Sequence, residues 1–442
     1  MTSTAAGRLG LWSATALVVG HTIAVGIFLT PAELIGALAS PALTFGLWIG
    51  AGAVVLAGAM TFGELAARYP QAGGLYVYLR EAWGERVAFL YGWQSLLIMD
   101  PGVTAALAVG AAQYLVIIWP AAAGSERGIA CAVIWTLALL TAAGLRIGAR
   151  VFGLMTAVKL ATLGAIILLA FVSADGDWAH FSSAAGRPAA APPVAEALAL
   201  GLVGVFFSFG GFWEASRIAG EVRDPRRTLP RAFVIGVATV TTIYLMTTAA
   251  FIYLVPPSAA TSAPEFARRF GEAAVGPAGP MVLAWVVVLS VIPSAMAMII
   301  VAPRLYEAMA ADGLFPATFA RRHRSTGAPM RATLVLAVLA TLFVLLGTFD
   351  QIVAFFLCTT LGFIALAAAA LLVVRRRAAL HDGLFRTPGY PVTPVLFILL
   401  VLTVVVMVAV HRPLQAVAGA AIVLIGVPLQ RRLAPLPGRV RR

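Results

Sequence analysis

Twelve long apolar stretches limit what this chain can fold into more than any other feature of its sequence. They occupy residues 11–38, 42–68, 83–119, 128–144, 149–174, 195–220, 230–255, 278–311, 328–348, 350–375, 390–410 and 413–430. A hydrocarbon core roughly 30 Å thick is crossed by about 20 helical residues. Backbone groups in lipid must pair within their own segment, which favours helices for runs of this length. We therefore expect an all-α integral membrane protein with 12 transmembrane helices.

The placement of the basic residues predicts how these helices are oriented. Counted with the spans above, 25 of the 30 arginines lie on the side of both termini. The other side holds five, namely Arg127, Arg187, Arg268, Arg269 and Arg412. The positive-inside rule assigns the arginine-rich side, and with it both termini, to the cytoplasm. The net charge of +13 is thus a topological signal, and no nucleic-acid partner is expected.

Two of the spans carry glycines that interrupt a helical pattern. "VVGHTIAVGIFLTP" (Val18–Pro31) lies in the first span, and "VFFSFGGFWEASRIAGEV" (Val205–Val222) lies in the sixth. Unwound backbone is tolerated in a membrane only where it faces protein or a water-filled cavity, and paired interruptions point to a transporter site. The amides at the start of one half-helix attract a carboxylate, and free carbonyls accept from an ammonium. Such a pair would hold a zwitterion, whereas close helix packing is the alternative role for these glycines.

Five motifs make the chain resemble a known family. They are "GIFLTP" (Gly26–Pro31), "FGELAARYPQAGGLYVYLREAWGERVAFLYGW" (Phe62–Trp93), "FFSFGGFWEASRIAGEVRDPRRTLPRAF" (Phe206–Phe233), "RLYEAMAADGLFP" (Arg304–Pro316) and "FRTPGYPVTPVLFIL" (Phe385–Leu399). Together they resemble the amino acid–polyamine–organocation transporters, most closely the L-type amino acid transporter branch and its bacterial relatives. The resemblance implies a single transporter domain over residues 1–442 with the leucine-transporter fold and discontinuous helices 1 and 6. Helices 1–5 (11–174) and 6–10 (195–375) would form inverted repeats, followed by helices 11 and 12 (390–430).

The resemblance also implies which residues bind the substrate. The amino group would be received by the backbone of Thr22, Ile23, Phe207, Ser208 and Gly210, and the carboxylate by the amides around Val25, Gly26 and Ile27. Ala24 and Gly211 complete the expected site, and Phe207 matches the aromatic gate that closes over the substrate. The chain departs from the family where Ala24-Val25-Gly26 replaces Gly-Ser-Gly and where His21 replaces a small or aliphatic residue.

Lys159 is the only lysine among the 31 basic residues, and it lies inside an apolar segment. It follows Arg150 by nine residues, or about 14 Å of helix at 1.5 Å per residue, which places it near mid-membrane. An intramembrane charge is by default a functional candidate. The resemblance implies that its ammonium replaces a sodium ion between helices 1 and 8, with Ser294 as a partner. A purely structural tie among helices 1, 5 and 8 is the alternative.

Other ionisable residues also fall in the spans. Asp100 precedes Pro101, and we expect it to pair with His21, to reach a polar substrate side chain, or to remain hydrated. His21 has a pKa range suited to proton exchange, although a hydrogen-bonded structural role is the simpler interpretation. Glu214 and Arg217 can face one another at i, i+3, which favours a structural pair near the inner gate. We interpret four further charges as gating or packing charges of the cytoplasmic loops, namely Glu64, Arg68, Glu81 and Glu85.

The function expected from these features is sodium-independent transport of neutral L-amino acids by alternating access, as an exchanger. Proton-coupled uptake, or transport of cationic amino acids or amines, is the alternative suggested by Asp100 and His21. An enzyme is disfavoured because the five histidines are scattered, and no catalytic residue, metal or cofactor is expected. The expected partners are an amino acid and the lipid bilayer, without an obligate protein partner. The use of arginine in place of lysine is typical of a GC-rich bacterial genome and suggests a multi-pass protein of the bacterial inner (plasma) membrane.

Overall fold

The computed structural model describes residues 9–143, 149–182, 193–257, 263–321, 323, 329–377 and 383–433. Every regular element in these ranges is a helix, and the only β-pairing there is an isolated bridge between Leu9 and Val222. The prediction of an all-α membrane protein is therefore confirmed. The two chain ends and Arg187 in the connection 174–194 lie outside the described residues, so the structure does not bear on them.

The first half of the chain contributes helices up to α8. Their bounds are α1 (Leu11–Thr22), α2 (Gly26–Leu38), α3 (Pro41–Arg68), α4 (Leu75–Trp83), α5 (Glu85–Gln94), α6 (Asp100–Ile118), α7 (Glu126–Ala142) and α8 (Ala149–Val172). A π-helical segment, Ser95–Met99, joins α5 to α6. Local capping explains the sharp turn between α2 and α3. Ala39 adopts a left-handed conformation, the Ser40 side chain accepts from the Leu43 amide at 3.4 Å, and Pro41 begins the helix.

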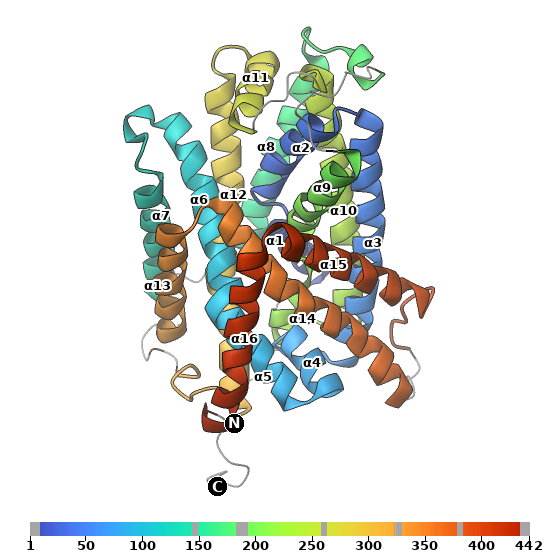
Figure 1. Ribbon diagram of the computed structural model, residues 1–442, viewed down its shortest axis with the longest axis vertical. Coiled ribbons are helices and arrows are strands. Elements are labelled where there is room, and N and C mark those ends of the chain that lie inside the picture. Colours follow the sequence, from blue (N-terminus) through green and yellow to red (C-terminus); the bar gives the residue numbers. More distant parts are fainter. Residues whose placement is uncertain are drawn as a thin grey trace.

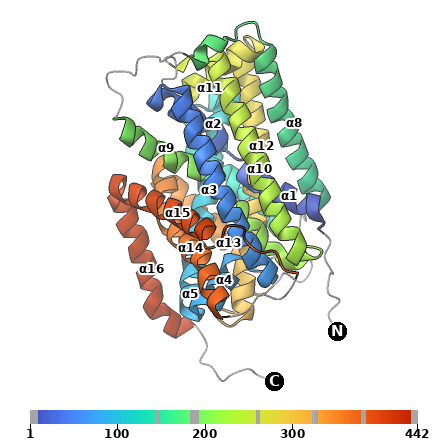
Figure 2. The same cartoon turned by 90° about the vertical axis from the view of Figure 1, so that its right-hand side faces the viewer.

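The second half contributes the remaining helices. Their bounds are α9 (Val194–Phe209), η4 (Phe212–Glu221, a 3₁₀-helix), α10 (Pro225–Leu254), α11 (Ala263–Val275), α12 (Gly279–Ala311), α13 (Met330–Leu346), α14 (Phe349–Arg377), α15 (Val392–His411) and α16 (Pro413–Leu433). The helices form an elongated bundle, with α2 and α11 toward one end and α4 and α5 toward the other (Figures 1 and 2).

Helices coincide with all of the apolar stretches found in the sequence, but not all are long enough for an unassisted span. Within the described ranges, nine helices are long and apolar enough to cross a membrane, and the bent pair α1–α2 makes up to ten. Helices α7 and α13 have 17 residues each, fewer than the roughly 20 that a straight crossing requires. Twelve spans and the inverted-repeat relationship therefore remain predictions.

The sequence did not predict helices α4 and α11, which lie in segments expected to be loops. Helix α4 is an integral part of the packed interior, because its Tyr76 and Tyr78 side chains are buried. The Tyr76 hydroxyl donates to Asp312 at 2.7 Å, and Arg80 forms an ion pair with the same carboxylate. Burial, and then the neighbouring Asp312, raises the pKa of Tyr76 above its ordinary value. These contacts tie α4 to the end of α12.

The interior of the bundle is formed by α6, α12 and α14. In α12, 78% of the most apolar window is buried within the protein, and the corresponding values are 61% for Glu85–Ile118 and 61% for α14. Helix α16 has only 11% of its window buried, so it lies at the periphery and its apolar side chains face the surroundings. An exposed apolar face of this kind marks a surface that contacts the membrane or another protein.

Candidate functional site

The first span is broken, as its glycines predicted. Helix α1 ends at Thr22, α2 begins at Gly26, and their axes differ in direction by 48°. Ile23 leaves helical geometry with φ −74° and ψ 103°. The break leaves carbonyl groups at the end of α1 and amide groups at the start of α2 without partners in their own helix. Both kinds of group are therefore presented at the same point of the bundle.

The sixth span is also interrupted. Helix α9 ends at Phe209, Gly210 has an extended ψ of 145°, and Gly211 has a φ of +101°. Only glycine adopts that positive φ readily. The chain then continues as the 3₁₀-helix η4, in which Ile218 has non-helical dihedral angles. The adjacent glycines thus produce the interruption that the sequence predicted.

The two interruptions lie directly against each other. A Cβ atom placed on Gly26 would lie 2.7 Å from Ser208 Oγ, and one placed on Gly211 would lie 3.2 Å from the His21 carbonyl oxygen. The Tyr244 hydroxyl on α10 lies 2.6 Å from the carbonyl oxygen of Ser208 and 3.1 Å from that of Thr22. One side chain therefore links both breaks. Sequence reasoning missed Tyr244, whose only signal was a tyrosine within an apolar span.

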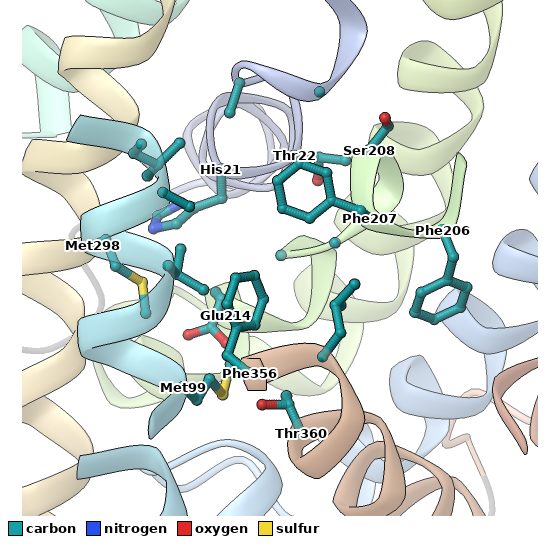
Figure 3. Close-up of a pocket in the computed structure, with 18 of the residues that line it drawn as sticks. His21, Thr22, Met99, Phe206, Phe207, Ser208, Glu214, Met298, Phe356 and Thr360 are labelled. Atoms are coloured by element: carbon teal, nitrogen blue, oxygen red, sulfur yellow. The ribbon is translucent and has the colours of Figure 1, made fainter. Parts of the chain in front are cut away.

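A cavity opens beside the two breaks (Figure 3). Many of the predicted site residues line it, namely His21, Thr22, Ala24, Gly26, Phe207, Ser208, Gly210, Gly211 and Ser294. Most of the remaining lining is apolar and comes from α6, α12 and α14, as with Val103, Met298 and Leu357. A mainly apolar cavity with a few convergent polar groups is typical of a small-molecule site.

Three predicted residues contribute differently. Ile23, Val25 and Ile27 are fully buried and are not among the described residues that line the cavity. The Val25 side chain packs against Gly110 on α6, where a Cβ atom would lie only 2.7 Å from Val25 Cγ2. The family serine is therefore replaced by a valine that points into the helix packing and does not narrow the cavity. Any contact of these three residues with a substrate would be made by their backbone.

Phe207 is half-buried, and its ring is directed into the cavity near Thr22 (Figure 3). Its ring centroid lies 6.2 Å from that of Phe349 and 6.2 Å from that of Phe356, both on α14. Aromatic pairs at this separation attract each other through edge-to-face contacts. The ring therefore lies between the break in the sixth span and α14. A gate would need this position, and the gating role of Phe207 remains a prediction.

Lys159 on α8 is buried, with 1% of its surface exposed, and its ammonium meets three oxygen atoms. The Nζ atom donates to the carbonyls of Gly20 at 3.0 Å and Ile23 at 2.6 Å, and to Ser294 Oγ at 2.7 Å. Ser294 in turn donates to the Gly20 carbonyl at 2.9 Å. The expected contact with Ser294 is therefore present, and α8 and α12 are tied to the end of α1. The role of the ammonium in place of a sodium ion stays a prediction.

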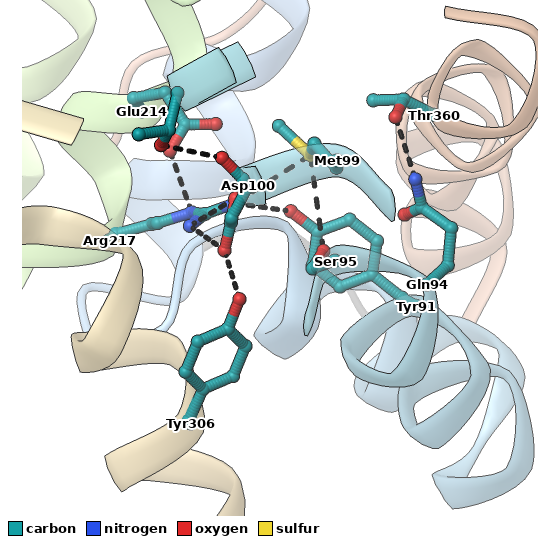
Figure 4. Close-up of polar contacts among 10 residues, drawn as sticks. Tyr91, Gln94, Ser95, Met99, Asp100, Glu214, Arg217, Tyr306 and Thr360 are labelled. Carbon is teal, nitrogen blue, oxygen red and sulfur yellow. Dashed lines mark hydrogen bonds and ion pairs between the residues drawn. The ribbon is translucent and has the colours of Figure 1, made fainter. Parts of the chain in front are cut away.

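Asp100 pairs with Arg217 and Tyr306 and not with His21. It is fully buried and accepts two hydrogen bonds of 3.1 Å from Nη1 of Arg217 and one of 3.1 Å from Nη2, while the Tyr306 hydroxyl also donates to it (Figure 4). His21 Nδ1 instead lies 3.0 Å from the Leu17 carbonyl in its own helix. The π-helical segment before Asp100 inserts an extra residue into the turn and changes which side chains face inward.

The predicted pair of Glu214 and Arg217 is present, with Oε2 and Nε 2.7 Å apart. Both side chains are buried, at 2% and 1% exposure. Arg217 thus pairs with Asp100 from α6 and with Glu214 from η4 at once. The guanidinium ties α6 to η4, Tyr306 on α12 joins the cluster through Asp100, and breaking such a buried pair is costly.

The charges assigned to cytoplasmic loops have mixed roles. Glu64 lies within α3 and is fully buried, where it accepts from Arg68 at 3.0 Å, from Arg375 at 2.5 Å and from the Thr387 amide at 2.7 Å. Glu64 is therefore a packing charge that joins α3 to α14 and to the segment after it. Glu81 lies 3.3 Å from Arg80 on the protein surface. Among the described residues, no cluster of three or more His, Cys, Asp or Glu side chains could hold a metal ion.

Comparison with known proteins identifies relatives along almost the whole chain. A family model described as amino acid permease matches residues 9–427. The Asc-type amino acid transporter 1 of Mus musculus is 29% identical over 96% of this chain and 80% of its own length. The large neutral amino acids transporter small subunit 2 of Homo sapiens is 26% identical over 96% and 79%, respectively. The serine/threonine exchanger SteT of Bacillus subtilis (strain 168) is 25% identical over 88% of each chain.

Proposed function

Because this chain belongs to the amino acid permease family, we propose that it exchanges neutral L-amino acids across the plasma membrane without using sodium. The family and its relatives are transporters and not enzymes, and the chain is a multi-pass membrane protein that transports amino acids. We propose three properties beyond amino acid transport itself: the class of amino acid, the exchange mode and the independence from sodium.

The ammonium of Lys159 carries the proposal of sodium independence. Its three contacts of 2.6–3.0 Å are made to two carbonyls and a hydroxyl, the type of oxygen ligand that binds a hard monovalent cation. A compact ammonium with three donors can satisfy these oxygens as a point charge. A sodium ion would have to displace a buried charge that is covalently attached to the protein. We therefore propose that Lys159 permanently supplies the positive charge that a bound sodium ion would otherwise supply in each transport cycle.

The paired breaks support an amino acid zwitterion as the substrate. We propose that the carbonyls at the end of α1 and around Phe207, Ser208 and Gly210 receive the ammonium group of the substrate. The amides around Gly26 at the start of α2 would receive its carboxylate, because a helix N-terminus favours an anion. Phe207 would then close over the bound substrate from outside. The side chain of the substrate would extend into the apolar part of the cavity.

A neutral substrate is favoured over a cationic one by the position of Asp100. This carboxylate was the main reason to consider amines, and its charge is already taken up by Arg217 and Tyr306. Exchange is favoured by the similarity to the bacterial relative, a serine/threonine exchanger. We further propose that the chain works alone, although the human relative is named as a small subunit.

Reconstitution of the purified chain into proteoliposomes tests the proposal. We expect uptake of labelled alanine into vesicles preloaded with unlabelled alanine, at equal rates in sodium and choline media, and little uptake into empty vesicles. Uptake that requires a sodium gradient would contradict the role of Lys159. Uptake into empty vesicles that a proton gradient drives would favour symport, and stronger competition by arginine, agmatine or putrescine than by alanine would favour a cationic substrate. Activity of the chain alone would exclude an obligate partner.

A further inference from the structure

We propose that the arginines at the start of α10 bind the phosphate headgroup of an anionic phospholipid. The four residues are Arg223, Arg226, Arg227 and Arg231, and we call them the α10 arginine cluster. The site lies on the outer surface of the bundle and not in the substrate cavity. It therefore goes beyond the proposed function, and it does not depend on which amino acid is exchanged.

The α10 arginine cluster is dense and exposed. Its four members fall within nine residues, all four are exposed, and the Arg227 side chain is exposed to 74%. Asp224 is the only acidic residue among positions 222–233, so this segment carries a net charge of +3. A concentration of one sign of charge on an exposed surface attracts ligands of the opposite sign.

The protein itself provides little to neutralise this charge. Arg227 Nε lies 3.9 Å from an oxygen of Asp224, which is a long separation for an ion pair. Within the described residues, the side chains of the other three members make no ion pair or hydrogen bond. Elsewhere, Arg304 and Arg375 each donate to a glutamate, at 3.1 Å and 2.9 Å. The α10 arginine cluster thus retains its hydrogen-bond donors for a partner outside the described chain.

Two members of the cluster stand on the face of α10 that is exposed along the membrane span. Arg227 and Arg231 are four residues apart, and the same exposed stripe continues through Ala238, Thr242 and Met246. Residues separated by four or seven positions share one face of a helix. Helix α10 is long and apolar enough to cross a membrane, so this stripe faces lipid. The two arginines therefore extend a lipid-facing surface at its polar end.

The length of α10 places that end at the level of the headgroups. Its 30 residues span about 45 Å at 1.5 Å per residue, whereas the hydrocarbon core is roughly 30 Å thick. At least one end of the helix must therefore extend beyond the hydrocarbon. The end that carries four arginines is the one that avoids the cost of charge in the hydrocarbon.

An exposed tryptophan marks the same level. A parallel bridge joins Leu9 to Val222, and the Arg223 amide donates to the Leu9 carbonyl at 2.8 Å. This bridge places the start of α1 beside the segment that enters α10, and the two helices lie side by side in Figure 2. Trp12, in the first turn of α1, is 75% exposed. Tryptophan is enriched where a membrane protein meets the headgroups, which supports a headgroup as the ligand.

The chemistry of the cluster selects an anionic lipid. Guanidinium groups bind phosphate oxygens through two parallel hydrogen bonds, and several basic residues next to a transmembrane helix are typical of anionic lipid recognition. Phosphatidylcholine has a phosphate whose charge is balanced by its own quaternary ammonium, whereas phosphatidylglycerol has a net negative charge. The positive-inside rule favours arginine on this side of the membrane, but it does not require four in nine residues beside a lipid-facing stripe.

Lipid titration of the purified chain in detergent tests the site. Phosphatidylglycerol and phosphatidylcholine with identical acyl chains would be added separately, and bound lipid would be measured by native mass spectrometry. We expect phosphatidylglycerol to bind about tenfold more tightly, with an affinity that falls as the salt concentration rises. Equal affinities for the two lipids would overturn the site. Displacement of phosphatidylglycerol by excess inorganic phosphate would assign the arginines to free phosphate and overturn it as well.

A pair of double variants assigns the binding to the cluster. Arg227→Gln/Arg231→Gln removes two charges from the lipid-facing stripe and is expected to weaken phosphatidylglycerol binding about tenfold. The matched control is Arg86→Gln/Arg376→Gln, which removes two exposed arginines that the sequence assigns to the same side of the membrane. This control is expected to bind phosphatidylglycerol like the wild-type protein.

The outcomes separate a local site from a general effect of charge. Unchanged binding by Arg227→Gln/Arg231→Gln would overturn the site. An equal loss in both double variants would show that only the net charge matters and would overturn it too. The melting temperature without added lipid reports whether each variant is folded. If the double variant is unfolded, Arg227→Gln and Arg231→Gln are compared singly with Arg376→Gln, and the same outcomes apply.

Discussion

At the scale of single residues, the different shapes of the lysine and arginine side chains explain why the buried cation at position 159 is a lysine. Lys159 reaches three oxygens that surround one point, at 2.6–3.0 Å. Arginine presents its donors in a rigid plane and would not fit the same oxygens without moving the end of α1 or the middle of α12. Everywhere else the chain uses arginine for positive charge. The buried lysine is therefore required for its shape as well as for its charge.

Lys159→Ala is predicted to stop exchange and to destabilise the protein. The carbonyls of Gly20 and Ile23 would lose a donor, at a cost of about 1–3 kcal/mol for each acceptor left unpaired. Lys159→Arg should fail to restore exchange, because the guanidinium is planar. The measurements are alanine counterflow and the melting temperature in detergent, with Val158→Ala as a control for a side chain of α8 that is 42% exposed. Normal exchange by Lys159→Ala would leave the lysine with a structural role only.

At the scale of secondary structure, the two breaks act as one unit. Gly26 at the start of α2 lies against Ser208 near the end of α9, and Gly211 lies against the His21 carbonyl. Tyr244 on α10 contacts the carbonyls of both broken helices. The glycines therefore have two roles, since they allow the backbone to leave helical geometry and also allow the two half-helices to approach closely. Close helix packing and the proposed substrate site, the two roles considered for these glycines, therefore depend on the same contacts.

Gly26→Ala is predicted to reduce exchange strongly at this contact. The added Cβ would lie 2.7 Å from Ser208 Oγ and 2.9 Å from Ser208 Cα, and the Cα atom cannot move by side-chain rotation. Overpacking of this kind costs about 1–3 kcal/mol and would move the breaks apart. The control is Gly50→Ala on α3, where no atom lies within 4 Å of the new Cβ. We expect at least a tenfold loss of apparent alanine affinity for Gly26→Ala. Equal affinities in both variants would contradict the close contact.

At the scale of the whole molecule, the bundle separates buried from peripheral helices. Helices α6, α12 and α14 supply much of the apolar lining of the cavity and are largely buried, whereas α16 faces its surroundings. The charge cluster of Asp100, Glu214 and Arg217 joins α6 to η4 beneath the cavity. Alternating access, which is part of the proposed function, requires one part of the bundle to move relative to another, and the charge cluster is expected to keep η4 with α6 during that movement.

The orientation in the membrane is predicted from the arginine distribution and is tested by labelling. Arg376 at the end of α14 and Arg412 between α15 and α16 are both exposed and are separated by the single helix α15. In a background without Cys131 and Cys358, Arg412→Cys should react with a membrane-impermeant maleimide added outside cells. Arg376→Cys should react only after permeabilisation. Labelling of both positions from outside would show that α15 does not cross the membrane.

The sequence alone determined the membrane class, the helical segments and the two interruptions. The length and hydropathy of an apolar segment, and the glycines within it, are local properties of the sequence. Their effects on helix formation can therefore be predicted from neighbouring residues alone. The local prediction was incomplete for α4, because burial of its tyrosines depends on contacts with distant helices. The ion pair between Glu214 and Arg217 was also predicted correctly from the sequence, because the two residues lie about one helical turn apart.

Only the tertiary structure decided which distant side chains meet. Asp100 pairs with Arg217 and Tyr306, which follow it by 117 and 206 residues, and no local pattern specifies those pairs. Val25 stands where the family has a serine, and the opposing Gly110 on α6 provides space for its side chain within the packing. Such pairings depend on which faces of separate helices come together, and that is set by packing of the whole bundle.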